Sequence, residues 1–221
     1  ERMQPRSHYV GTTKPSHGGP VWTGKIAIAP EHIFTAPLRW KSPRTIFVNS
    51  MADLFHENVS DEVIDRVFAI MGLCPQHTFQ VLTKRAKRMR EYFRPAKARV
   101  IAEEAFELTC AALMADSNSK VGAGLLLTGD IAHLKVWPLP NVWLGVSAEH
   151  QQEADERIPD LLAAPAAIRF VSAEPLLGLI YFTRLRPPQE KRLYGFPNLD
   201  ALRGSWFVDG HTPKDDDALQ D

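Results

Sequence analysis

The fold is decided by residues 44–82, RTIFVNSMADLFHENVSDEVIDRVFAIMGLCPQHTFQVL. The two ends of this stretch, residues 44–48 and 78–82, are short runs of β-branched and aromatic residues, which predict buried strands. Between them Ser60 offers an N-cap, and apolar residues then recur at helical spacing as far as Met71. A strand, a helix and a second strand in this order predict a βαβ unit with parallel strands.

The same alternation continues along the chain. Apolar periodicity and the proline and glycine positions predict helices over 84–93 and 98–115, a strand over 141–146, a helix over 151–164 with its break at Pro159, and a fourth strand over 167–171.

The remaining segments carry no clear periodicity. Residues 1–25 predict loop, and the glycines and prolines of residues 117–140 predict an insertion. The strand and helix patterns become weak after Leu185, so we expect one domain over 1–185 and an irregular segment over 186–221.

Strands that alternate with helices predict an α/β fold, with a parallel sheet of repeated βα units and right-handed crossovers. The near-continuous apolar strands indicate burial on both faces of the sheet. The aromatic residues Trp40, Phe47, Trp143 and Phe170 are accordingly assigned to the core. Two architectures fit this pattern, an open doubly wound sheet and a partial (βα) barrel.

Composition excludes several classes of protein. The chain has 221 residues, with 26 basic against 26 acidic residues and 44% hydrophobic residues, which excludes a disordered chain. Two cysteines are too few for a disulfide scaffold. No apolar run approaches the ~18 residues of a membrane span, and no signal-peptide pattern precedes a cleavage site. We therefore expect a cytoplasmic protein without membrane contact.

The neutral total conceals an asymmetry between the two halves. Residues 1–99 hold 16 Lys and Arg against 8 Asp and Glu, whereas residues 100–221 hold 10 against 18. A basic half can mark a site for an anionic ligand, and the two halves can equally attract each other within one domain. A basic cluster at 84–90 has two readings as well, a nucleic-acid surface or a solvated helix face.

Polar side chains follow each of the four predicted strands. In either architecture, ligands collect at the carboxyl ends of the strands. Every strand end carries a hydroxyl residue, and the tripeptide Ser-Ala-Glu occurs twice, at 147–149 and 172–174. Capping of the following helices is the competing explanation for any one of these residues. Taken together they predict contacts to a polar ligand from Asn49, Ser50, Asp53, Thr83, Lys84, Ser147, Glu149, Ser172 and Glu174.

Two further groups have weaker patterns. Asp53 and His56 fit an acid–base or metal pair, but also a surface contact. Cys74 and Cys110 are 36 residues apart and have no metal-ligand spacing, so we interpret both as buried thiols. The sequence as given therefore predicts no metal ligand, and leaves catalytic residues unassigned.

Four motifs closely resemble a phage- and bacteria-associated family of three-Cys-motif proteins (phage Gp37/Gp68-like), which looks related to radical S-adenosylmethionine (SAM) enzymes. The motifs occur in order at residues 46–56, 77–85, 138–147 and 169–176, and the similarity spans roughly residues 20–185.

The resemblance implies a partial (βα) barrel of radical-SAM type that binds a [4Fe–4S] cluster and SAM. Family members carry three closely spaced cysteines before a stretch whose tail resembles Glu1-Arg2-Met3. The resemblance therefore implies that this chain is a fragment, truncated at both ends. Such a fragment lacks the cluster segment and is inactive by itself. The resemblance strengthens the strand-end residues as cofactor contacts without assigning their roles, and leaves the substrate unknown. The alternative is a phage-associated nucleic-acid- or partner-binding module without catalysis.

Overall fold

The structure is a computed structural model, and it describes residues 10–49, 52–115, 136–192, 198–202 and 205–207. The described elements, in chain order, are β1 (Thr13–Lys14), β2 (Val21–Trp22), α1 (Glu31–Phe34), the 3-10 helix η2 (Ala36–Arg39), β3 (Thr45–Val48), α2 (Asp61–Gly72), β4 (Thr78–Thr83), α3 (Ala86–Tyr92), α4 (Lys97–Ala115), β5 (Val142–Ser147), α6 (Gln151–Ala163), β6 (Ile168–Ser172), the 3-10 helix η4 (Gln189–Lys191), β7 (Asn198–Asp200) and β8 (Ser205–Phe207).

The main sheet confirms the predicted parallel arrangement of βα units. Its four strands lie in the order β3-β4-β5-β6, and every neighbouring pair is parallel. The strands therefore lie side by side in the order in which they occur in the chain. A doubly wound sheet requires a reversal of strand order, and the described sheet has none, so the doubly wound alternative is wrong for this part of the chain.

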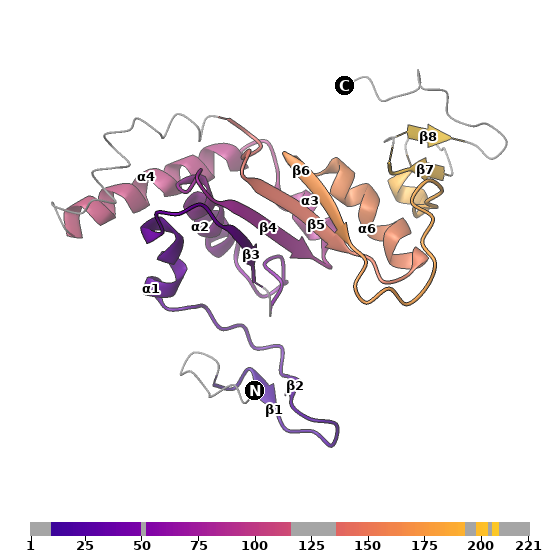
Figure 1. Cartoon of the computed structure of the whole chain (residues 1–221), viewed down its shortest axis with the longest axis horizontal. Helices are drawn as coiled ribbons and strands as arrows, with labels where there is room; N and C mark the ends of the chain where they lie inside the picture. The colour runs from indigo at the N-terminus through magenta and orange to yellow at the C-terminus, as the bar shows by residue number, and fades with distance from the viewer. Residues whose placement is uncertain (1–9, 50–51, 116–135, 193–197, 203–204, 208–221) are drawn as a thin grey trace.

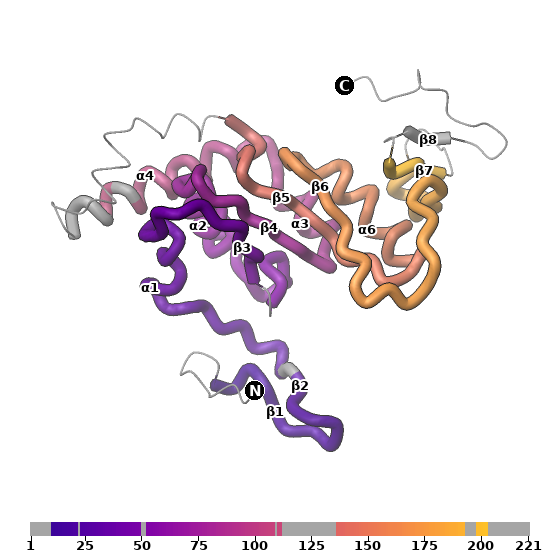
Figure 2. Tube along the Cα trace, in the orientation of Figure 1, coloured from indigo at the N-terminus to yellow at the C-terminus, as the bar shows by residue number. Residues whose placement is uncertain are grey.

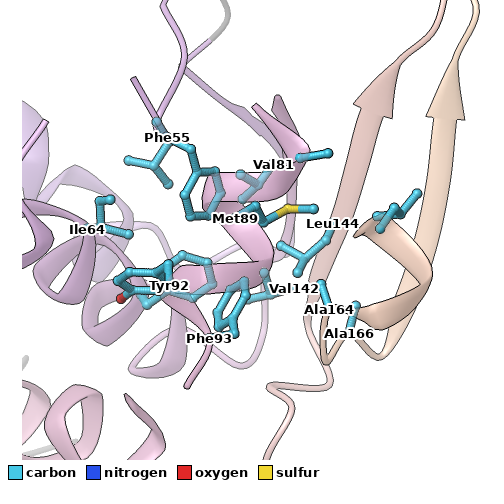
Figure 3. Close-up of a cluster of buried hydrophobic side chains, with 14 of the residues drawn as sticks. Phe55, Ile64, Val81, Met89, Tyr92, Phe93, Val142, Leu144, Ala164 and Ala166 are labelled. Carbon is cyan, nitrogen blue, oxygen red and sulfur yellow. The ribbon is translucent and has the colours of Figure 1, made fainter. Parts of the chain in front are cut away.

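The helices α2, α3 and α6 lie behind the sheet in Figure 1, on one and the same face. Right-handed crossovers that always step in the same direction bring every connecting helix to one side. The core fills the space between that face and the helices, and includes Phe68 of α2 and Met89 of α3. Figure 3 shows part of this cluster, with Met89 and Phe93 labelled. Phe93 stands edge-on to Phe68, with 5.2 Å between the ring centroids.

The opposite face of the sheet is uncovered by any helix among the described residues. Phe47 of β3 is 45% exposed and Ile168 of β6 is 43% exposed, while Trp143 and Phe170 are half-buried. The expectation of burial on both faces, with these aromatic residues in the core, is therefore wrong for the described structure. The reason is topological, because apolarity of a strand does not reveal on which side its helices pack.

The helix α6 follows its local sequence signal at its start but not at its internal proline. The helix α6 begins with a capping contact in which the His150 N–H donates to the Glu153 carboxylate at 3.0 Å. It then continues through Pro159, where the sequence predicted a break. Pro159 is buried, so tertiary packing on this face outweighs the loss of one intrahelical hydrogen bond.

Two short antiparallel pairs flank the main sheet. β1 pairs with β2 inside the segment predicted as loop, and β7 pairs with β8 inside the segment predicted as irregular. Each strand has only two or three residues, too few for a periodic signal. The predicted insertion falls largely on 116–135, outside the described residues. Within the described part of the chain, no helix combines the length and apolarity needed to cross a bilayer.

Candidate functional site

The carboxyl ends of β3, β4, β5 and β6 meet along one edge of the sheet, as the parallel register requires. Asn49 follows β3 directly and has a φ of 56°, in the left-handed region that few residues other than glycine adopt. Its carbonyl accepts a hydrogen bond from the Ala52 N–H at 3.0 Å, which turns the chain sharply at the strand end. Ser50, also predicted as a ligand contact, lies outside the described residues.

Asp53 is the centre of a hydrogen-bond network that joins the loop after β3 to the end of β4. Its Oδ1 accepts from the Thr83 hydroxyl at 2.7 Å and from the Phe55 N–H at 2.9 Å. Its Oδ2 accepts from the Lys84 N–H and from Arg85 Nη1, both at 3.0 Å. Both carboxylate oxygens are thus filled by intramolecular donors, so Asp53 holds the edge together instead of offering a free carboxylate.

Arg85 extends this network to the surface. Its Nε donates to the Glu57 carboxylate at 2.8 Å. That hydrogen bond is the main reason that the pKa of Glu57 falls to about 2, with the positive charges of Arg85 and His56 adding to the effect. Arg85 therefore bridges Asp53, beside the end of β4, to Glu57 at the surface.

Glu149 forms a second centre, between β4, β5 and α6. Its carboxylate contacts the Lys84 ammonium and accepts from Arg157 Nη1 at 3.1 Å. Burial raises the pKa of Glu149, but the hydrogen bond from Lys84 and the charges of Lys84 and Arg157 outweigh it, so the net shift is downward. Arg157 also donates to the Ser147 carbonyl at 2.8 Å. Glu149 is therefore an ionised, partnered carboxylate that fixes Lys84 over the sheet edge.

The second Ser-Ala-Glu tripeptide has a different environment. Glu174 is exposed, and no described residue forms a hydrogen bond or ion pair with its side chain. Ser147 and Ser172 face each other in the register of β5 and β6. Ser147 lies four residues after Trp143 and Ser172 lies two residues after Phe170. Because side chains an even number of residues apart share one face of a strand, both serines lie on the uncovered face with these aromatic residues. The two tripeptides thus give one internally paired carboxylate and one open to solvent.

A pocket of about 640 Å³ lies where the β3 end of this edge meets the N-terminal segment. Pockets that take small ligands commonly have volumes of roughly 300–1,000 Å³. Phe47 and Phe34 contribute aromatic walls, while Asn49, Asp53 and Arg85 contribute polar groups. Two of the predicted contact residues, Asn49 and Asp53, therefore line one pocket. Thr83, Lys84, Ser147, Glu149, Ser172 and Glu174 do not line it.

The basic cluster at 84–90 is largely neutralised by partners within the chain. Lys84 pairs with Glu149, Arg85 with Asp53 and Glu57, and Arg90 with Asp160 at 2.8 Å. The Arg88 guanidinium donates to backbone carbonyls, that of Val59 at 2.6 Å among them. Phosphate binding by this cluster would have to displace these partners, so the structure favours a role in holding the edge together. The nucleic-acid hypothesis stays a prediction.

Asp53 and His56, which fit an acid–base or metal pair, and the two cysteines lie in separate environments. His56 Nδ1 accepts from the Asn58 N–H at 3.1 Å, and the His56 N–H donates to the Asp53 carbonyl at 3.1 Å. Among the described residues, no hydrogen bond joins the His56 side chain to the Asp53 carboxylate. Cys74 is buried at the end of α2, and burial raises the pKa of its thiol to about 12. Cys110 is only half-buried on α4, so its assignment as a buried thiol is wrong. Among the described residues, no three His, Cys, Asp or Glu side chains are grouped to bind a metal ion.

Arg157 and Glu57 are the members of this edge that the sequence did not identify. Both lie in segments that read as ordinary polar stretches, after β5 and β3 respectively. An arginine in the helix that follows an acidic strand end was the available signal for Arg157, because that helix packs back against its own strand.

One family profile matches residues 1–210, and the family is described as "Protein of unknown function (DUF5131)". The chain belongs to this family. The region matched in this DUF5131 protein includes all four strand ends, so the polar edge lies within the family's shared part. No curated protein and no solved structure matches the chain. Relationships to phage three-Cys-motif proteins and to radical-SAM enzymes stay predictions.

Proposed function

We propose that this DUF5131 protein is a partial (βα) barrel of radical-SAM type that binds SAM and an unidentified substrate along the carboxyl edge of β3–β6. The observation that carries the proposal is the strand order, with four sequential parallel strands and their helices on one face. In a (βα) barrel, the face without helices is the interior and the carboxyl edge is the ligand-binding end. The polar groups of this chain collect at that same edge.

The side chains best suited to meet SAM are those without hydrogen-bond or ion-pair partners among the described residues. Glu174 offers a free carboxylate to the ammonium group or to the ribose hydroxyls of SAM. Asn49 offers a neutral amide inside the pocket of about 640 Å³. Phe47, also in this pocket, offers an aromatic surface for the adenine ring. Asp53 and Glu149 are positioning residues in this proposal, because their carboxylates are occupied by neighbouring donors.

The described residues do not fit an iron–sulfur cluster. Cluster ligation takes cysteine thiolates, whereas Cys74 is buried with a raised pKa and Cys110 lies on α4, an outer helix. A [4Fe–4S] cluster bound to this protein would therefore need cysteine ligands other than Cys74 and Cys110. What this chain would contribute is binding and orientation of the ligand over the uncovered face.

Equilibrium dialysis with radiolabelled SAM tests the proposal. We expect saturable binding of one SAM per chain, weakened about tenfold or more in Glu174→Gln and in Asn49→Ala, the factor for a hydrogen bond of roughly 1.4 kcal/mol. Glu103→Gln is the matched control, because Glu103 is an exposed carboxylate on α4. Absence of saturable binding, or equal binding by all variants, would contradict the proposal. Binding of DNA or RNA instead, weakening steeply with salt, would favour the nucleic-acid module.

A further inference from the structure

Among the described residues, no strand pairs with the outer edge of β3, and this edge of the sheet is open. Arg44 O accepts from the Thr78 N–H at 2.8 Å, so the backbone groups of residues 44, 46 and 48 face β4. By the alternation of a parallel ladder, the backbone groups of Thr45 and Phe47 point to the other side, where no described strand pairs with β3. An edge with unpaired N–H and C=O groups is a template for one more strand.

A segment with strand-like sequence lies near this edge. Residues 25–29 read Lys-Ile-Ala-Ile-Ala, in which two β-branched residues alternate with other residues. The structure assigns them no regular element. None of the backbone groups of residues 26–29 has a hydrogen-bond partner among the described residues. Ile28 is 58% exposed, although isoleucine is usually buried in globular proteins.

The segment and the open edge share the pocket of about 640 Å³, which Ile26, Ile28 and Phe47 all line. Figure 2 shows the chain running from β2 to α1 on the β3 side of the sheet. The segment is bounded by Gly24, whose φ is +80°, and by Pro30. Beyond Pro30, α1 is held to α2 by the ion pair of Glu31 with Arg66 at 2.6 Å.

Chain topology favours parallel pairing between this segment and β3. Residues 30–44 separate the two and contain α1 and η2, a connection of the dozen or more residues that a parallel crossover requires. A strand at 25–29 followed by helix and then by β3 repeats the strand–helix–strand order of the rest of the sheet. It would place the new strand before β3, and so continue the sequential order.

We infer that residues 25–29 form a hinged strap that docks as a fifth parallel strand on the open edge of β3. Docking pairs the free backbone groups of Thr45 and Phe47 and covers Ile28. The hinges are Gly24, which tolerates the backbone rotation that opening needs, and the Ala29–Pro30 junction. The docked strap closes the pocket along β3 and leaves the carboxyl edge, with Asn49, at its mouth. This inference does not depend on the proposed function, although the strap lines the same pocket as Asn49 and Phe47.

Disulfide trapping tests the strap in the full chain. Phe47→Cys is combined in turn with a cysteine at 26, 27, 28 or 29, in a Cys110→Ser background, and each protein is oxidised mildly. Neighbouring strands lie about 4.8 Å apart, within the Cα separation that a disulfide tolerates. Successive strand residues point to opposite faces, so we expect strong intramolecular cross-linking at alternate positions only, either 26 and 28 or 27 and 29. Ile168→Cys, on the opposite edge with similar exposure, is the control that must not cross-link.

Moving the first cysteine from Phe47 to Thr45 provides an independent check of register. The best cross-linking position should then shift by two residues toward the N-terminus. This second series does not contain Phe47→Cys, so misfolding of that variant would not affect its result. Equal cross-linking at all four positions, or none in either series, would overturn the strap. Cross-links between chains would also overturn it, because the edge would then be taken by a second copy.

Discussion

Replacement of Asp53 by asparagine is the sharpest perturbation of the carboxyl edge. Asparagine keeps the shape of the side chain and one acceptor oxygen, so the bonds from the Thr83 hydroxyl and the Phe55 N–H can persist. The second oxygen becomes an NH₂ group, which faces the Lys84 N–H and the Arg85 guanidinium. Donors then face donors, and two hydrogen bonds are lost.

The magnitude follows from these two bonds. A neutral hydrogen bond contributes about 1 kcal/mol and one to a charged group about 1.5–3 kcal/mol. Arg85 keeps its bond to Glu57, and its side chain is 30% exposed, so the charged term belongs at the low end. We therefore expect Asp53→Asn to lower the free energy of unfolding by about 2.5 kcal/mol, equivalent to roughly 5–10 °C in Tm for a chain of this size.

Urea unfolding followed by tryptophan fluorescence measures this difference. Glu103→Gln is the control, because its ion pair with Arg99 is exposed and should contribute no more than about 0.5 kcal/mol. A loss below about 0.5 kcal/mol for Asp53→Asn would refute the view that Asp53 ties β3 to β4. A loss of stability no larger than that of Glu103→Gln would also refute this role of Asp53.

Three further predictions address other parts of the molecule. Gly145→Ala should cost about 1–3 kcal/mol, because a Cβ there would lie 2.5 Å from the Phe170 ring; Phe170→Leu in the same chain should recover part of this loss in urea titrations. Glu57 has a lowered pKa, so its stabilising contribution is present above its ordinary pKa of 4.5 and is lost as pH falls toward about 2. The stability difference between wild type and Glu57→Gln should shrink over that interval and also in 1 M salt, and a difference that grows as pH falls would contradict this sign. A protein that keeps Cys74 as its only cysteine should react with a thiol reagent at pH 8 only as fast as it unfolds, and fast native-state labelling would contradict its burial.

Much of the central fold was predictable because its elements are long enough to show a period. The helix at 61–72 and the strand at 78–83 lie within a residue or two of their predicted bounds. What periodicity could not reveal was the direction in which successive strands step across the sheet. That direction decides that Phe47 is half-exposed and not buried, and it depends on long-range packing.

The candidate site was predictable as an edge but not as a set of roles. Strand-end position identified Asp53, Glu149 and Glu174 alike. The structure distinguishes them, because Asp53 and Glu149 are held by cations from other elements while Glu174 has no described partner. Contacts such as that from Asp53 to Arg85 join residues more than thirty positions apart, and no local pattern encodes them.

The short segments escaped prediction for a related reason. The strap at 25–29 has only five residues and no partner strand in the described structure, so its alternation is too brief to identify a strand. The interpretation of this segment as a strand depends on its position beside the open edge of β3.

Hydrogen exchange with and without saturating SAM tests the central claim most directly. We predict that SAM slows exchange in peptides that cover Asn49, residues 83–85, residues 147–149 and residues 172–174, at the carboxyl ends of β3–β6. Peptides from the amino ends of the same strands, and from the outer faces of α2 and α4, should be unchanged. Protection confined to those amino ends or helices, or no protection at any SAM concentration, would contradict a ligand site at the carboxyl edge.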